Sequence, residues 1–400
     1  MNLRFLLPLF VFIATVWARA PKGRRFRPHS IVHPGLLHTE ADFTRIRDYV
    51  KSGAEPWKSG LEKLVARADP RWQPRPYETV CRGRNGGCTE NYPVLYRDVH
   101  AAYANAVYWK ITGNTTHADA AVRIIDAWSS TMKYLNGSTD AALAAGIYGY
   151  QLANVAELLR TYEPWKGLPA ITRLLVDVFY EASERFLRTK NGQPPDHYWA
   201  NWDLANLCNI HAIGVLSNNR SMIHHAVDYF KTADGMGAIE NAIWKIHKEE
   251  GTGERLGQNQ EAGRDQGHAT LVFAHLAVLA QQSYNQGEDL FALLENRILA
   301  GSEYMAKYNL GHDVPYSTYT NKHGIMTQIS DYGRGIVRPI GELLYGHYNG
   351  IKNLEAPWTR AYRDYVLEHS GGAEGGGGDY GSTSGGYDQL GFGTLLFRRN

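Results

Sequence analysis

Four side chains capable of acid–base chemistry lie close together in the stretch 257–281. They are Glu261, Arg264, Asp265 and His268. Their separations of three and four residues place side chains on one face of a helix, which we expect over 260–284. The apolar run over 271–279 predicts that this helix enters a core. An acid, a guanidinium and an imidazole at such a helix start indicate a site, although a solvated turn with ordinary salt bridges fits equally well.

Three further clusters carry polar or aromatic side chains that could act on a ligand. The first is Asn201-Trp202 at the start of an apolar helix, where the Asn would also suit a helix cap. The second is a tyrosine-rich loop and the third is a pair of arginines that follows it. These residues are Tyr316, Tyr319, His323 and Tyr332 in the loop, then Arg334 and Arg338. Taken alone, an aromatic surface loop and solvated arginines explain the last two clusters as well.

Together these residue types suit one reaction that needs no metal, the β-elimination of a uronic acid polymer. The proton on C5 of a uronate is too weak an acid to leave until the adjacent carboxylate is neutralised. An Asn amide or an Arg can hold that carboxylate and stabilise the enolate-like transition state. A His or Tyr can then take the C5 proton, and a Tyr hydroxyl can protonate the leaving O4.

Two other functions would use some of the same residues. A glycoside hydrolase needs a pair of carboxylates across a cleft, which Glu261, Asp265 and Asp203 could supply. A non-catalytic sugar-binding protein would need only the aromatic rings and Arg. The sequence shows no Gly-rich phosphate loop, zinc-ligand spacing or Ser nucleophile elbow, so we expect no metal and no cofactor. Three other histidines are expected to be structural: His197, His211 and His275.

Several longer motifs resemble one enzyme family. They are ANWDLANL, EAGRDQGHATL, NQGEDLFALLENRILAGSEYMAKYNLGHDVPYSTY and GRGIVRPIGELLYGHY. Each is weak alone, but together they resemble the alginate-lyase-like polysaccharide lyases, and most closely polysaccharide lyase family 38. The resemblance extends from the segment 33–47 to the segment 384–395. It implies an (α/α) toroid, an incomplete barrel of paired helices, and lyase activity on polyuronates such as polymannuronate, alginate or glucuronan.

The resemblance also implies roles for two residues of the first clusters. Asn201 matches the position of the family's carboxylate-neutralising Asn, and His268 matches that of its catalytic His. Other helical-toroid lyases carry a His directly after the neutralising Asn, whereas Trp202 follows here. A simple transfer of that His pair to this chain is therefore in doubt.

The catalytic Tyr is harder to place because several tyrosines crowd the loop. We favour Tyr319, with Tyr316 and Tyr332 as alternatives. Arg264 and Arg334 are the expected partners of the substrate carboxylate. The expected substrate-binding residues are Trp202, Glu261, Tyr316, His323, Tyr332 and Arg338. For mannuronate or glucuronate, where the C5 proton and O4 lie on the same side, one Tyr could serve as both base and acid if neighbouring Arg and His lowered its pKa.

The elements that would hold these residues read as a succession of helices. Helical spacing of apolar residues predicts helices at 93–112, 116–134, 139–162, 167–189, 199–217, 221–231, 236–249, 260–284 and 288–308. No convincing strand–turn–strand pattern precedes residue 310. The chain then becomes loop-rich. We expect the loop around 310–334 and the Gly-rich tail to lie at one mouth of the toroid, with the tail packed back on the body.

Composition and termini predict a secreted protein. The first 20 residues read as a signal peptide, which leaves residues 21–400 as a single catalytic domain. Cys81 and Cys88 bracket a short loop and are expected to form a disulfide, with Cys208 a buried free thiol. The sequons begin at Asn114, Asn136 and Asn219. A net charge of +2 gives no reason to expect nucleic acid, and we expect an extracellular monomer that binds an acidic polysaccharide and no membrane.

Overall fold

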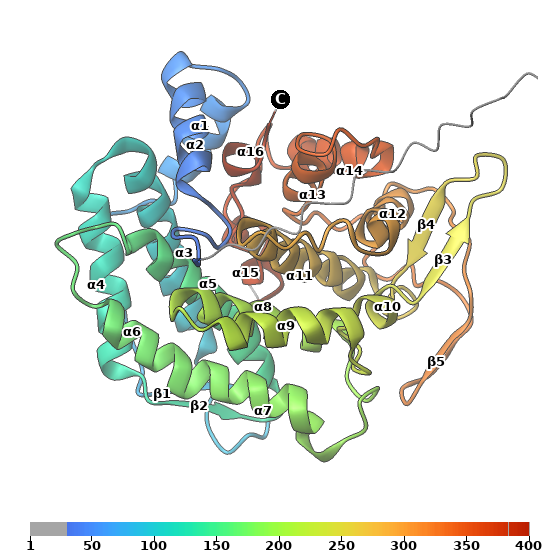
Figure 1. Cartoon of the computed structure of the whole chain (residues 1–400), viewed down its shortest axis with the longest axis horizontal. Helices are drawn as coiled ribbons and strands as arrows, with labels where there is room; N and C mark the ends of the chain where they lie inside the picture. Colours follow the sequence, from blue (N-terminus) through green and yellow to red (C-terminus); the bar gives the residue numbers. More distant parts are fainter. Residues whose placement is uncertain (1–29, 383, 400) are drawn as a thin grey trace, which may run out of the picture.

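The computed structural model describes residues 30–382 and 384–399, and helices dominate it (Figure 1). The α-helices are α1 (Glu40–Ser52), α2 (Trp57–Val65), α3 (Tyr92–Thr112), α4 (Thr115–Thr131), α5 (Asp140–Leu159), α6 (Leu168–Leu174), α7 (Glu181–Thr189), α8 (Ala200–Leu216), α9 (Arg220–Thr232), α10 (Ile239–Ala242), α11 (Gln266–Asn285), α12 (Leu293–Asn309), α13 (Gly341–Tyr348), α14 (Pro357–His369), α15 (Ser384–Tyr387) and α16 (Gly393–Leu396). A π-helical segment η1 (Leu175–Tyr180) and two 3-10 turns, η2 (Lys190–Gly192) and η3 (Gly377–Tyr380), complete the helical part. The strands are β1 (Thr79–Arg82), β2 (Tyr134–Gly137), β3 (Lys245–Lys248), β4 (Arg255–Gln258), β5 (Tyr319–Asn321) and β6 (Gly324–Met326).

The helices form an inner and an outer layer, which confirms the expected all-α toroid of paired helices. Helices α5, α8 and α11 are buried at nearly every position and lie side by side as inner helices. Helices α1, α4, α9 and α14 bury one face only, as amphipathic outer helices do. Outer helix α4 packs on α3, and α9 packs on α8. The buried faces of the two layers therefore form one continuous core.

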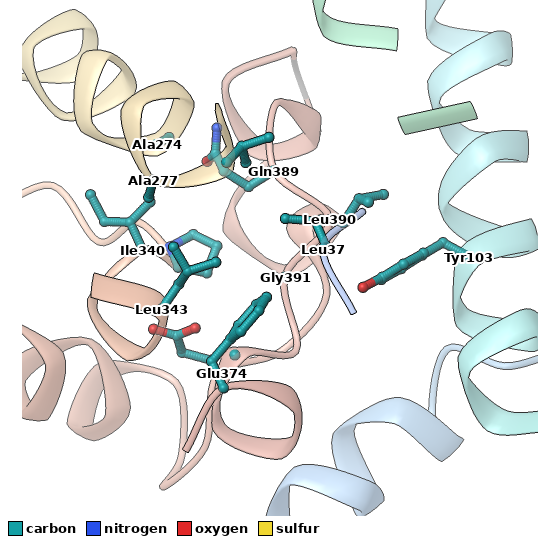
Figure 2. A pocket seen from close by; sticks show the side chains of 14 residues that line it. Leu37, Tyr103, Ala274, Ala277, Ile340, Leu343, Glu374, Gln389, Leu390 and Gly391 are labelled. Atoms are coloured by element: carbon teal, nitrogen blue, oxygen red, sulfur yellow. The ribbon is translucent and has the colours of Figure 1, made fainter. Parts of the chain in front are cut away.

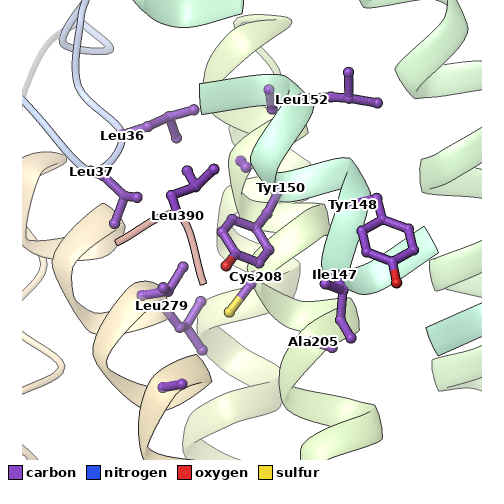
Figure 3. Packing of buried hydrophobic residues seen from close by; sticks show 14 of the residues in the cluster. Leu36, Leu37, Ile147, Tyr148, Tyr150, Leu152, Ala205, Cys208, Leu279 and Leu390 are labelled. Atoms are coloured by element: carbon purple, nitrogen blue, oxygen red, sulfur yellow. The ribbon is translucent and has the colours of Figure 1, made fainter. Parts of the chain in front are cut away.

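Helices α5 and α8 approach one another closely because a glycine of α5 lies against the backbone of α8. A Cβ atom at Gly146 of α5 would lie 2.7 Å from the backbone carbon of Ala205 in α8, so no larger residue fits there. Figure 3 shows the neighbouring core, where Tyr150 of α5, Cys208 of α8 and Leu279 of α11 meet Leu390 of the C-terminal segment. The tail thus packs into the toroid, as predicted.

Strands occur where the sequence was expected to be helical. The helix predicted over 236–249 is instead the short α10 followed by β3, which pairs antiparallel with β4. Gly251 and Gly253 both have positive φ values and form the turn between these strands, which a helix could not accommodate. Strands β1 and β2 also pair, in parallel, with Arg82 opposite Gly137. The expectation that no strands precede residue 310 is therefore wrong.

The start of α11 also differs from the prediction. Asp265 has extended backbone angles (φ −170°, ψ 161°) and its side chain caps the helix, which begins at Gln266. The cap forms because an Asp side chain accepts a free N–H group of the first turn more favourably than it continues a helix. Glu261 and Arg264 consequently lie in a turn before α11 and not on its face.

Both cysteine predictions are confirmed. Cys81 and Cys88 form a disulfide, and Cys208 is a buried free thiol. No helix in the described part of the chain has the length and apolar character needed to cross a membrane. The predicted signal peptide lies outside the described residues. Of the sequon residues, Asn114 caps α4, Asn219 caps α9, and Asn136 is exposed in β2.

A carboxyl group is enclosed where the C-terminal segment packs on α11 and α13. Figure 2 shows Glu374 with Ile340, Leu343 and Gly391 around a cavity of about 30 Å³. Burial, and then the neighbouring carboxylate of Glu342, raise the pKa of Glu374 well above its usual value. Folding therefore favours the protonated form of this acid.

Glu374→Gln is expected to stabilise the protein increasingly as the pH rises. A carboxyl whose pKa is raised by folding contributes its full stability only below the ordinary value of 4.5, and that contribution is lost at higher pH. Glutamine imitates the protonated acid at every pH. Thermal unfolding of both proteins from about pH 4 to about pH 9 should show a Tm difference that grows with pH. A difference that stays constant would contradict this assignment.

Candidate active site

The centre of the candidate site is a turn, residues 259–264, that crosses the start of α8. Gln260 Oε1 accepts a hydrogen bond from the backbone N–H of Ala200 (2.6 Å), and Glu261 Oε1 accepts one from that of Asn201 (2.9 Å). The residue before α8, Trp199, provides no side-chain cap. The turn therefore supplies the acceptors that the first N–H groups of α8 need, and it is fixed against that helix.

Asn201 and Glu261 form a buried pair inside this turn. Asn201 Nδ2 donates to the two carboxylate oxygens at 2.7 and 2.9 Å, and both residues are fully or almost fully buried. Arg264 Nη1 donates to Glu261 Oε2 at 2.9 Å and so compensates the buried negative charge. Asn201 Oδ1 is buried and has no hydrogen-bond partner among the described residues.

Arg264 is the member of this group that faces outward. Its side chain is 26% exposed, whereas that of Glu261 is not exposed at all. The guanidinium also lies over the ring of Trp199, 4.9 Å from the ring centroid. Since an Arg has five N–H donors and only one binds Glu261, others can bind a carboxylate that arrives from outside.

His268 stands beside Arg264 in the first turn of α11 and is held by Asp265. Asp265 Oδ1 accepts from the His268 backbone N–H, and Oδ2 lies 2.7 Å from His268 Nδ1. Burial alone would raise the pKa of Asp265, but the hydrogen bonds from His268 and the charge of Arg264 lower it, so the carboxylate is ionised. An ionised acceptor at Nδ1 keeps a proton there and leaves Nε2 as the basic atom of the imidazole.

Tyr319, at the start of β5, is joined to the same turn. Gln260 Nε2 donates to the Tyr319 hydroxyl at 2.9 Å, while Gln260 Oε1 holds α8. Burial raises the pKa of Tyr319, and the charges of Asp196 and Glu261 raise it further, despite the hydrogen bond from Gln260. The hydroxyl is therefore protonated in the absence of a ligand, which suits an acid.

The two alternative tyrosines are placed differently. The Tyr316 hydroxyl donates to the Met326 carbonyl at 3.2 Å, and burial raises its pKa to about 12. Tyr332 is 78% exposed and its carbonyl accepts from the backbone N–H of Gln266. Neither hydroxyl has a hydrogen bond that ties it to the turn 259–264 in the described structure.

The two arginines after the loop bind the protein itself. Arg334 donates from Nε to the Tyr308 carbonyl (2.8 Å) and from Nη2 to the His312 carbonyl (3.0 Å). Arg338 is almost fully buried and donates to Thr270 Oγ1 and to Gln389 Oε1, which joins α11 to the tail. The structure therefore brings together Asn201, Glu261, Arg264, Asp265, His268 and Tyr319. Arg338 binds the first turns of α11, whereas Arg334 binds none of these six residues.

The aromatic residues and His323 surround this group. Trp202, half-buried, packs against Tyr198 with ring centroids 4.9 Å apart. His323, on the tip of the β5–β6 hairpin, stacks on Trp199 at 5.0 Å. Trp199 was not singled out from the sequence, because its importance depends on Arg264 and His323 reaching it from distant parts of the chain.

Asp388 is a further residue that the sequence did not indicate. It lies in the tail, is only 4% exposed, and its Oδ1 has no hydrogen-bond partner among the described residues. Burial raises its pKa to about 6, although Arg338, Arg82 and His268 each lower it through their charges. These three groups come from three separate segments, so only the fold reveals their proximity to Asp388.

The carboxylates suggested for a hydrolase are each engaged in the structure. Glu261 binds Asn201 and Arg264, and Asp265 binds His268. Asp203 is fully buried and accepts hydrogen bonds from Lys190 (2.5 Å), the Tyr229 hydroxyl (2.7 Å) and the Gly237 N–H (3.1 Å). In the described part of the chain, no three His, Cys, Asp or Glu side chains form a group suited to a metal ion.

Comparisons with known proteins identify one matching family and several structures of similar fold. A family model described as alginate lyase matches residues 83–313. An alginate lyase from Bacteroides ovatus has a TM-score of 0.55 at 12% identity, over 84% of this chain and 100% of that chain. An alginate lyase A1-III variant complexed with tetrasaccharide gives 0.53 at 13%, over 82% and 91%. Alginate lyase A1-III from Sphingomonas species A1 gives 0.49 at 15%, over 82% and 92%. No curated protein matched the chain.

Proposed function

This chain belongs to the alginate lyase family and is a polysaccharide lyase, and from that premise we propose that it cleaves polymannuronate or glucuronan by β-elimination. Each cut would leave a 4,5-unsaturated uronide at the new end. The observation that carries the proposal is the Asp265–His268 pair beside Arg264, with the Tyr319 hydroxyl joined to the same turn. The motifs quoted above favour family 38 within the polysaccharide lyases.

In the proposed reaction, Arg264 binds the carboxylate of the reacting uronate. Asn201 Nδ2 donates to Glu261, and Glu261 in turn holds the Arg264 guanidinium in place. Neutralising the carboxylate makes the C5 proton acidic enough to remove and stabilises the charge that develops in the transition state.

His268 Nε2 is the proposed base and Tyr319 the proposed acid. A Tyr that acts as both would need a lowered pKa, whereas burial raises that of Tyr319 in the unliganded protein. A base and an acid from separate elements are compatible with elimination from either stereoisomer. We favour mannuronate or glucuronate linkages on the strength of the family resemblance alone.

The proposal is tested by absorbance in the ultraviolet band of the unsaturated uronide. We expect absorbance to rise with polymannuronate or glucuronan, and more slowly with polyguluronate. The rate should be unchanged in excess chelator, because the Arg264 guanidinium takes the place of a cation. A hydrolase would release saturated ends without absorbance, and loss of turnover in chelator that calcium restores would contradict the metal-free mechanism.

We further propose that the enzyme is secreted and acts outside the cell as a single catalytic domain and a monomer. The Cys81–Cys88 disulfide supports an oxidising compartment, and the Asn114 and Asn136 sequons are exposed. Mass analysis of the mature protein would identify the cleavage site near residue 20 and any glycans.

A further inference from the structure

Three basic side chains gather where the β5–β6 hairpin meets the segment before α8. We call His197, Lys322 and His323 the hairpin cluster. Lys322 Nζ contacts His197 Nε2, and the His323 ring stacks on Trp199 with an interplanar angle of 10°. Trp199 directly precedes α8, and Arg264 lies over the same indole ring. In Figure 1 the hairpin is the orange loop that carries the label β5.

The hairpin cluster is connected to the proposed catalytic residues by hydrogen bonds. Tyr319 begins the same hairpin and accepts the hydrogen bond from Gln260, which in turn caps α8 at Ala200. Lys322 and His323 of the cluster therefore lie on the same hairpin as the acid that would protonate O4. A ligand group bound by the cluster would lie close to the sugar that reacts.

Lys322 carries the positive charge of the hairpin cluster. Among the described residues, no carboxylate lies within salt-bridge distance of Lys322, His197 or His323. Burial, and then the charge of Lys322, lower the pKa of both His197 and His323. The charged groups that act on His197 are Lys322, His323 and Asp196. Those that act on His323 are Lys322 and Arg264. Asp196 is the one acid among them, and it raises the pKa of His197.

We propose that the hairpin cluster binds the carboxylate of the uronate adjoining the one that is cleaved. This inference rests on the proposed function. A polyuronate carries a carboxylate on every sugar, so a chain whose reacting carboxylate lies on Arg264 must place another one nearby. Lys322 has no ion-pair partner in the described structure, so a ligand carboxylate would supply the counter-charge that this lysine lacks.

The subsite would make the enzyme selective for consecutive charged sugars. A neutral sugar at that position would leave the basic side chains desolvated without a counter-charge, which is unfavourable. His323 was expected to bind substrate and His197 to be structural. The contact of Lys322 with His197, and the position of His323 next to Lys322 on the hairpin tip, place both histidines in one site.

Lys322→Met tests the proposal, because Met keeps the apolar stem and removes only the charge. We expect KM for polymannuronate or glucuronan to rise about tenfold with kcat nearly unchanged, as for the loss of one charge-assisted hydrogen bond. Lys322→Glu should raise KM further. Lys248→Met, at an exposed lysine of the β3–β4 hairpin, is the matched control and should leave KM unchanged.

Binding to uncleaved oligosaccharide, measured calorimetrically in a Tyr319→Phe background, separates charge from packing. Lys322→Met should weaken binding of the uronate oligosaccharide and leave binding of its methyl ester, which lacks the charges, unchanged. Equal weakening of both ligands, or no weakening of either, would overturn the subsite. Failure of the proposed function is distinguishable, because the wild-type enzyme would then produce no unsaturated product from any polyuronate.

Discussion

Tyr319→Phe is expected to lower kcat by at least about 10²-fold while leaving polymer affinity almost unchanged. The substitution removes the proton carrier and keeps the ring, which packs beside Trp244 with centroids 5.2 Å apart. Turnover is measured by ultraviolet absorbance and affinity by calorimetry with an uncleaved oligosaccharide. A selective loss of kcat would identify the hydroxyl as the proton donor.

Tyr332→Phe is the matched control for this experiment. Its ring is largely exposed, so the loss of its hydroxyl should change neither turnover nor stability. If Tyr319→Phe instead keeps a near-normal rate on every polyuronate, the acid is another residue. Tyr316 would then be tested first, since its hydroxyl lies next to Gly263 of the turn 259–264.

Asn201→Ala is expected to lower kcat about 10²-fold, because Asn201 holds Glu261 and Glu261 positions the Arg264 guanidinium. It should also destabilise the fold by about 1–3 kcal/mol, because Glu261 loses a buried hydrogen-bond donor. Turnover and thermal unfolding of the same preparation report the two effects separately.

Asn206→Ala distinguishes catalysis from stability in that comparison. Asn206 is also a fully buried asparagine of α8, and its Nδ2 donates to the Trp202 carbonyl within the helix. Its removal should lower Tm to a similar extent and leave kcat within a few-fold of wild type. Equal losses of kcat in both variants would show that Asn201 acts only through the stability of α8.

The sequence predicted the layers of the fold because those depend on local patterns. Apolar residues at helical spacing identified α5, α8 and α11, and the same residues fill the core. The start of α11 was misplaced because periodicity does not record that Asp265 caps the helix. The β3–β4 hairpin was missed because its glycine turn lies inside a stretch with helical spacing.

The sequence indicated which residues could form the candidate site but not which of them contact one another. Asn201, Arg264 and His268 were recognisable because few functions need those groups together. That Glu261 would bind Asn201, and that Gln260 would join Tyr319 to α8, depends on contacts across about 60 residues of chain. Spacing along the sequence carries no information about such contacts, which is why Asp388 and Lys322 were overlooked.

The orientation of one amide has a consequence for the direction of proton transfer. The Gln260 oxygen faces α8 and its nitrogen faces Tyr319, so the phenolic oxygen must accept and its own hydrogen must point elsewhere. In the described structure that hydrogen is directed at Met236 Sδ, 3.8 Å away, and a thioether is a weak acceptor. The Tyr319 hydroxyl therefore loses little when a glycosidic oxygen replaces Met236 Sδ as its acceptor. Because α8 fixes the orientation of the Gln260 amide, the direction of the Tyr319 O–H group is set before the sugar binds.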